Sequence, residues 1–227
     1  MSRFFYAFIS FSHMSIKVFI GVSAIFLSMH FAPYLNAALI QDSNPKELVK
    51  IIRNLLTKGE LAKAIELSDA GLKTNPKNSE FFFLKARAYQ DLRRNTDALA
   101  NYSIAIYLNP KFVNAFINRG LVRGALQDVN GALIDLDQAL VLQPNNTAAL
   151  LNRGVTYAGL NKPSLAIQDF NKAIQINPNY PDAYRNRGLT KHLLGDKDGA
   201  CDDWHKSKNL GINEATEWLT KYCMQQK

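Results

Sequence analysis

The sequence predicts an all-α protein built as a solenoid of helix–turn–helix repeats, because one pattern recurs at a fixed interval. Pro76, Pro110, Pro144 and Pro178 are each separated by 34 residues, and each follows Asn or Gln. Apolar residues between them are spaced three and four apart, which is typical of amphipathic helices. With the proline set at position 32, position 20 of all five copies is alanine. These alanines are Ala64, Ala98, Ala132, Ala166 and Ala200.

Small and large residues also recur at fixed positions of the repeat. Position 8 is glycine or alanine in four copies, and position 27 is always small. Small side chains allow two helices to approach closely, and large ones fill the space that remains. Position 24 is large and apolar in four copies, which have Tyr102, Leu136, Phe170 and Trp204.

Each repeat is predicted to hold two helices, at about positions 2–14 and 18–30. A turn joins them, and it carries Gly59 in the first copy and Gly195 in the fifth. The proline ends the second helix, because a proline inside a helix costs about 3 kcal/mol. After the fifth copy, residues 213–224 are expected to form one more amphipathic helix. Its apolar residues Trp218, Leu219 and Tyr222 would cover the last repeat.

This pattern resembles the tetratricopeptide repeat, and the resemblance covers about three quarters of the chain. It implies a right-handed α-solenoid of five repeats with a C-terminal capping helix. The expected domains are a leader at 1–37, a linker at 38–44, repeats at 45–78, 79–112, 113–146, 147–180 and 181–214, and a cap with a tail at 215–227.

The leader has the order of a secretory signal peptide. Residues 1–40 contain no Asp or Glu, and residues 18–31 are mostly apolar. A signal peptide cleaved after Ala37 would give a secreted or periplasmic protein. The alternative is a membrane anchor over residues 4–39, although a membrane span needs about 20 apolar residues. Met14 is a second candidate for the true start.

The last three repeats share an arginine at position 7, where an apolar residue is usual, and an aspartate at position 23. Where position 7 is not arginine, position 23 is not aspartate. A half-buried arginine needs a partner of opposite charge, so we predict structural ion pairs, with contact to an acidic ligand as the alternative. The predicted pairs are Arg119 with Asp135, Arg153 with Asp169 and Arg187 with Asp203.

By resemblance, the first helix of each repeat lines an inner groove that binds a partner chain. Asn118, Asn152 and Asn186 share position 6, where a row of asparagines can donate to and accept from a peptide backbone. The alternative is that asparagine is merely common at this position. The other predicted groove residues are apolar or basic, and for each of them a place in the core is the alternative. They are Phe83, Arg87, Ile117, Leu121, Leu151 and Val155.

Cys201 and Cys223 are the two cysteines, and they are equally distant from a turn near residues 211–212. Residues equidistant from such a turn are neighbours in a helical hairpin, so we predict a disulfide. Two buried free thiols are the alternative. Cys201 and His205 lie at i and i+4, with Cys223 across from them, but three ligands without a fourth do not define a zinc site, so no metal is expected.

Composition and motifs disfavour other function classes. The formal net charge of +8 is spread along the chain without a basic stripe, so no nucleic-acid partner is expected. Hydrolase, zinc-protease and nucleotide-binding motifs are missing, so neither enzyme activity nor a cofactor is expected. The expected function is a scaffold that binds a peptide or another protein. The alternative is a self-assembling or structural subunit of a membrane-attached complex; the oligomeric state is not predicted.

Overall fold

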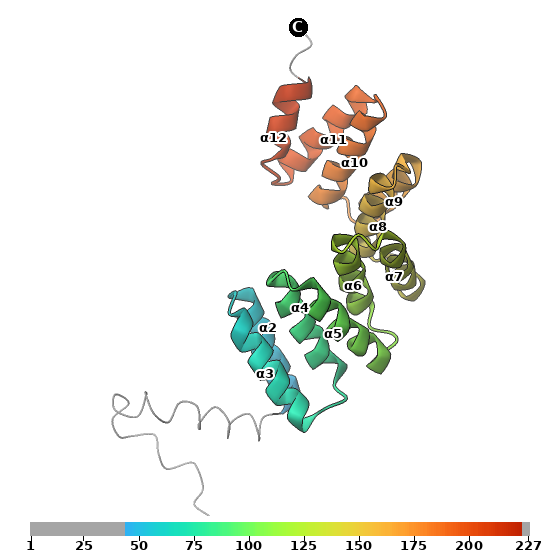
Figure 1. Cartoon of the computed structure of the whole chain (residues 1–227). Helices are drawn as coiled ribbons and strands as arrows, with labels where there is room; N and C mark the ends of the chain where they lie inside the picture. Colours follow the sequence, from blue (N-terminus) through green and yellow to red (C-terminus); the bar gives the residue numbers. More distant parts are fainter. Residues whose placement is uncertain (1–43, 224–227) are drawn as a thin grey trace, which may run out of the picture. The chain divides into compact units, whose positions relative to one another are not determined.

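The computed structural model describes residues 44–223, and every element in this range is helical (Figure 1). Ten helices form five consecutive pairs, and a short terminal segment follows. The pairs are α2 Pro45–Thr57 with α3 Leu61–Thr74, α4 Ser79–Asp91 with α5 Asn95–Leu108, α6 Val113–Ala125 with α7 Val129–Leu142, α8 Thr147–Gly159 with α9 Pro163–Ile176, and α10 Pro181–Leu193 with α11 Lys197–Asn209. The predicted α-solenoid of five helix–turn–helix repeats is therefore confirmed.

The helices pack in chain order. The two helices of each pair lie together, and the second helix of each pair contacts the first helix of the next pair. The first helices α2, α4, α6, α8 and α10 also contact one another in succession, while the second helices lack contacts of this extent within residues 44–223. The first helices are therefore closer together and form the inner face of the stack, and the second helices form its outer face.

The recurring prolines define where the second helices end. Helix α5 ends at Leu108, and Asn109 then takes an extended conformation (φ −136°, ψ 89°) before Pro110. A residue before proline is sterically excluded from the helical region, so the helix stops there. In the fifth pair, which lacks the proline, α11 ends at Asn209 and Gly211 reverses the chain with φ +104°.

Every turn within a repeat requires a left-handed residue at position 15. The five residues have φ between +56° and +84°. Glycine adopts this conformation readily, whereas other L-residues do so at a cost of about 1–2 kcal/mol. The sequence pattern identified only the two glycines. The five residues are Gly59, Arg93, Gln127, Asn161 and Gly195.

Close packing explains the recurring small and large residues. A Cβ atom added to Gly154 would lie 2.6 Å from the ring of Phe170, and one added to Gly188 would lie 2.7 Å from Trp204. Phe170 and Trp204 are fully buried. Each glycine at position 8 thus makes room for the large residue at position 24 of the same repeat.

The cap differs from the predicted single helix. Helix α12, Ala215–Trp218, is continued by the π-helix η2, Leu219–Cys223. A π-helical turn holds more residues than an α-helical one, and here Leu219, Tyr222 and Cys223 all pack against Ala200 and Trp204 of α11. The predicted apolar cover of the last repeat is therefore present with a different local geometry.

The predicted leader and the start at Met14 lie outside the described residues. Among residues 44–223, none of the helices combines the length and apolar character that crossing a bilayer requires.

Candidate functional site

Three asparagines lie in register on the inner face. Asn118, Asn152 and Asn186 occupy equivalent places on α6, α8 and α10, and all three are half-buried. The side-chain amide of Asn186 donates to the backbone oxygen of Asp182 at 2.8 Å. The amides of Asn118 and Asn152 have no hydrogen bond to any other residue of the range 44–223, so both groups can bind a ligand.

Partly exposed apolar side chains stand beside these amides, and one of them, Leu151, also packs against the central apolar cluster. Leu121 and Val155 are 40% and 44% exposed, one turn further along their helices than the asparagines. Leu151 is half-buried. Leu193 of α10 is 79% exposed and extends the apolar surface, although the sequence pattern did not single it out.

Two predicted groove residues belong to the core instead. Phe83 is 3% exposed and packs its ring 4.7 Å from Phe112 and 5.7 Å from Tyr102. Ile117 is 6% exposed and lies in the central apolar cluster. The groove prediction for these two residues was therefore wrong, because their position fills the space between consecutive repeats.

The basic residues at the ends of the inner face are partly neutralised. Arg53 forms an ion pair with Glu80, and Arg185 forms one with Asp182 at 3.0 Å. Arg87 is half-buried and has no ion pair within the described part of the chain. The centre of the inner face is uncharged, since repeats three and four have no charged residue at positions 2, 5, 6, 9 and 13.

The three predicted arginine–aspartate combinations are in contact. Each arginine donates two hydrogen bonds from Nε and Nη2 to both oxygens of a buried aspartate. The distances are 2.9 and 2.7 Å for Arg119 with Asp135, 2.8 and 2.7 Å for Arg153 with Asp169, and 2.8 and 2.5 Å for Arg187 with Asp203. This bidentate geometry holds the first and second helices of one repeat in register.

Each of these arginines also reaches back to the preceding repeat. Nη1 of Arg153 donates to Asp137 at 2.7 Å, and Nη1 of Arg187 donates to Asn171 at 2.6 Å. The hydrogen bonds to Asp169 and Asp137 raise the pKa of Arg153 above its usual range. Sequence reasoning missed this second contact, although polar residues at position 25 of four repeats were a visible signal. They are Asp69, Ser103, Asp137 and Asn171.

A second cation supports the buried aspartate in two of the three repeats. Arg123 lies 3.0 Å from Asp135, and Lys191 lies 3.0 Å from Asp203. The fourth repeat has Tyr157 at this position, so Asp169 depends on Arg153. These cations are engaged inside the fold, and their charge serves the packing of helices.

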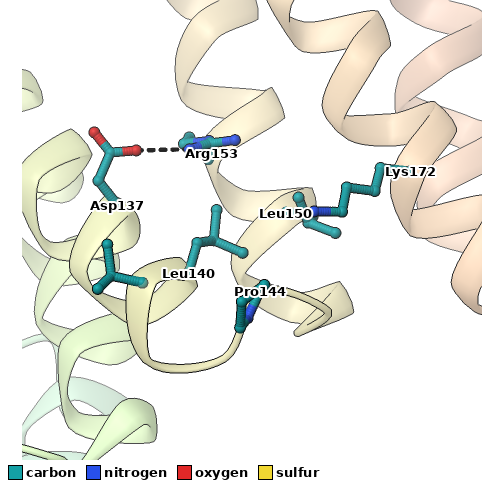
Figure 2. A pocket seen from close by; sticks show the side chains of 7 residues that line it. Asp137, Leu140, Pro144, Leu150, Arg153 and Lys172 are labelled. Carbon is teal, nitrogen blue, oxygen red and sulfur yellow. Dashed lines mark hydrogen bonds and ion pairs between the residues drawn. The ribbon is translucent and has the colours of Figure 1, made fainter.

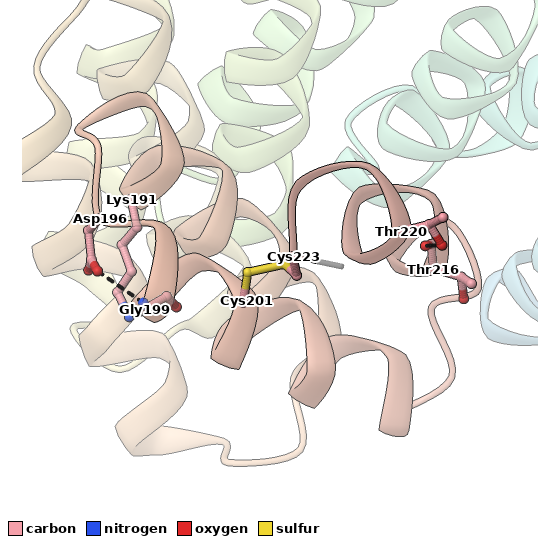
Figure 3. The surroundings of a disulfide bond; sticks show 7 residues. All are labelled: Lys191, Asp196, Gly199, Cys201, Thr216, Thr220 and Cys223. Atoms are coloured by element: carbon pink, nitrogen blue, oxygen red, sulfur yellow. Dashed lines mark hydrogen bonds between the residues drawn. A yellow bond between two sulfur atoms is a disulfide. The ribbon is translucent and has the colours of Figure 1, made fainter. Parts of the chain in front are cut away.

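The terminal segment is tied to the last repeat by a disulfide between Cys201 of α11 and Cys223 of η2, with 5.9 Å between the Cα atoms (Figure 3). Beneath it, the rings of Trp218 and Tyr222 lie 5.7 and 5.9 Å from the ring of Trp204. His192 joins this cluster at 4.3 Å from Tyr222. The sulfurs are therefore engaged with each other, and within residues 44–223 no group of three His, Cys, Asp or Glu is placed to hold a metal.

A hollow of about 350 Å³ opens on the outer face between repeats three and four (Figure 2). Its wall is apolar, and the Arg153–Asp137 ion pair and Lys172 stand at its edge. The sequence pattern gave no indication of it. The lining residues are Asp137, Leu140, Val141, Pro144, Leu150, Arg153 and Lys172.

Comparison with known proteins gives consistent matches to repeat families. Three family models described as tetratricopeptide repeat match residues 49–112, 147–180 and 170–202, together more than half of the chain. No curated protein gives a significant match.

Solved structures share the fold. The structure of pilF from Pseudomonas aeruginosa is 17% identical, with a TM-score of 0.71, over 81% of this chain and 82% of that chain. MamA is 25% identical, with a TM-score of 0.62, over 76% of this chain and 98% of its own. YrrB, described as having an unusual peptide-binding site, is 19% identical, with a TM-score of 0.62, over 82% and 97%.

Proposed function

Because the chain belongs to the tetratricopeptide repeat family, we propose that it is a non-enzymatic scaffold that holds an extended peptide segment of a partner protein on its inner face. The family and its fold typically mediate protein–protein interaction. The proposal adds the place and the chemistry of binding.

The observation that carries the proposal is the row formed by Asn118, Asn152 and Asn186 beside Leu121 and Val155. Two of the asparagine amides have no hydrogen-bonding partner within residues 44–223, and an amide can pair with both the N–H and the C=O of an extended chain. The neighbouring leucine and valine, 40% and 44% exposed, offer contact area for apolar side chains. The peptide-binding site described for YrrB supports a ligand of the same class.

The charge pattern restricts the ligand. Repeats three and four carry no charge at the inner positions, and the arginines at position 7 are held by their aspartates. A charged peptide would lose hydration at the centre of the groove without gaining a counter-charge. The preferred segment is therefore uncharged and has apolar side chains.

Selection of peptides from a display library against the protein would test this function. We expect selected peptides to lose at least about tenfold in affinity with Val155→Asp, and to lose less with Asn152→Ala, by fluorescence anisotropy. Gln168→Asp on the outer face is the matched control and should bind normally. Equal affinity for the wild type and Val155→Asp would refute the groove.

We also infer that the protein is exported. A disulfide persists in oxidising compartments, and the Cys201–Cys223 bond is therefore consistent with the apolar leader at residues 18–31. Alkylation of fresh cell extracts with a maleimide reagent tests the redox state. Modification of both cysteines without prior reduction would contradict export.

A further inference from the structure

The outward positions of the second helices change character along the stack. These are positions 22, 26 and 29, which follow one another at helical spacing on one side of each second helix. They are charged or polar in repeats four and five, and they include Glu66 and Lys73 in repeat one. In repeats two and three they carry no charge. The residues there are Ala100, Ile104 and Tyr107 on α5, and Ile134, Gln138 and Val141 on α7.

Four of these side chains form what we call the outer strip: Ile104, Tyr107, Ile134 and Val141. They are 40%, 82%, 66% and 72% exposed, so most of the surface of all but Ile104 is left uncovered. By ordinary residue areas these four side chains together expose roughly 500 Å² on two successive second helices, an area comparable to the largest apolar patch of a monomer. Neither the helix packing nor the inner groove accounts for it.

We propose that the outer strip binds a second copy of this chain in a two-fold symmetric dimer. A two-fold axis parallel to the helices, between α5 and α7, places α5 of one copy against α7 of the other. Such a contact would bury roughly 1,000 Å² in total, which reaches the lower bound of a specific interface. The inference goes beyond the proposed function, because it concerns the opposite face of the stack.

The strip has a projection and a hollow that suit each other under this symmetry. Tyr107 is the most exposed residue of the strip, and Val141 occupies the same repeat position on α7, so the axis sets the two opposite each other. Val141 also lines the hollow of about 350 Å³ with Leu140, Pro144 and Leu150 (Figure 2). The Tyr107 ring of one copy therefore lies within reach of the hollow of the other, and a buried aromatic anchor is typical of strong interface contacts.

The charges beside the strip are arranged so that like charges do not face each other. The same axis pairs repeat two with repeat three, and repeat one with repeat four. Each lysine at positions 29 and 33 of the first two repeats then faces an amide side chain. The pairs are Lys73 with Gln175, Lys77 with Asn179, and Lys111 with Asn145. These lysines therefore meet amide oxygens and not other cations, which allows a second copy to bind despite the positive net charge.

Sedimentation equilibrium over a range of concentrations tests the dimer, with the full chain and with residues 44–227, which form one compact unit with its own core. We expect Tyr107→Lys and Val141→Glu each to raise the dissociation constant by about tenfold or more. The double variant Tyr107→Lys/Val141→Glu should recover association, because each lysine then faces a glutamate of the other copy. Asn209→Glu, at the same position of the fifth repeat, is the control and should dimerise like the wild type, because the axis leaves that repeat without a partner.

Several results would overturn the proposal. They are a wild-type chain that stays monomeric at all concentrations, single variants that associate as the wild type does, and a double variant that fails to recover. If the strip instead binds an acidic foreign segment or an anionic lipid surface, the wild-type chain stays monomeric. If the chain associates through residues 1–43, the single variants associate as the wild type does. Circular dichroism checks that the variants remain folded. Val155→Asp should dimerise normally, so failure of the dimer and failure of the groove are distinguishable.

Discussion

Replacing Arg153 with leucine should destabilise the protein more than any other single removal among the three position-7 arginines. Arg153 donates two hydrogen bonds to Asp169 and one to Asp137. Asp169 is buried, so the variant leaves its carboxylate without a counter-charge and shielded from water. Removing one partner of a buried ion pair costs about 3–5 kcal/mol. Arg153 itself is partly exposed, so water reaches the site and we expect about 3 kcal/mol.

The third repeat provides the matched control. Arg119→Leu leaves Arg123 within 3.0 Å of Asp135, so the buried aspartate keeps a cation. We expect a loss of about half as much, near 1.5 kcal/mol. Combining Arg153→Leu with Asp169→Leu should recover much of the stability, because the carboxylate that then lacks a partner, Asp137, is exposed to water and no buried charge is left unpaired.

Thermal and urea unfolding followed by circular dichroism measure these differences. For a unit of this size 1 kcal/mol shifts Tm by about 2–4 °C, so Arg153→Leu should lower Tm by about 6–12 °C. Equal losses for Arg119→Leu and Arg153→Leu would refute the supporting role of the second cation. An unchanged Tm for Arg153→Leu, together with lost peptide binding, would show that the arginine serves a ligand instead.

Four further perturbations have expected outcomes in the same unfolding assays. Gly154→Ala should cost about 1–3 kcal/mol because its Cβ would meet a buried phenylalanine ring at 2.6 Å, whereas Gly124→Ala, with nothing within 4 Å, should stabilise by up to about 1 kcal/mol. Gln127→Gly should stabilise by about 1 kcal/mol, since φ is +66° there, and an unchanged Tm would contradict the strain. Cys201→Ser should cost about 3 kcal/mol because it opens a disulfide loop of 22 residues, and dithiothreitol should have the same effect on the wild type. Burial raises the pKa of Tyr102. The neutral phenol therefore stabilises the fold fully below the unfolded pKa of about 10, and this contribution is lost as pH rises through the higher folded pKa. Tyr102→Phe should accordingly flatten the fall in Tm above about pH 10.

The fold was predictable because its signals are local and repeated. The signals are the prolines that end the helices, the alanines at position 20 and the glycines packed against Phe170 and Trp204. Each acts within one repeat or between neighbouring repeats, so a constant separation along the chain corresponds to the same contact in every copy. The ion pairs of the position-7 arginines were also predictable, because a buried charge needs a partner of opposite sign, and an aspartate recurs 16 residues later in the same repeats.

The rest depended on geometry that spacing does not encode. Phe83 and Ile117 share a position with Leu151, yet two are buried and one is half-buried, because the neighbouring aromatic and aliphatic residues differ from repeat to repeat. The left-handed conformation of the turn residues Arg93 and Gln127 could not be predicted, because neither residue type is typical of positions with a positive φ. The outer strip appears only when exposed fractions are known.

The stack is anchored unequally at its two ends. The last three repeats are linked by guanidinium groups that reach both forward and backward, and the final one is also closed by a covalent bond. The first repeat has Ile51 and Leu67 at the corresponding places, so apolar contact and two partly exposed ion pairs, Arg53 with Glu80 and Lys85 with Asp69, join it to its neighbour. Since each repeat touches only adjacent ones, thermal opening begins at the end with the weakest link. Heat therefore frays this molecule from α2 inward, and the carboxyl-terminal repeats are the last to melt.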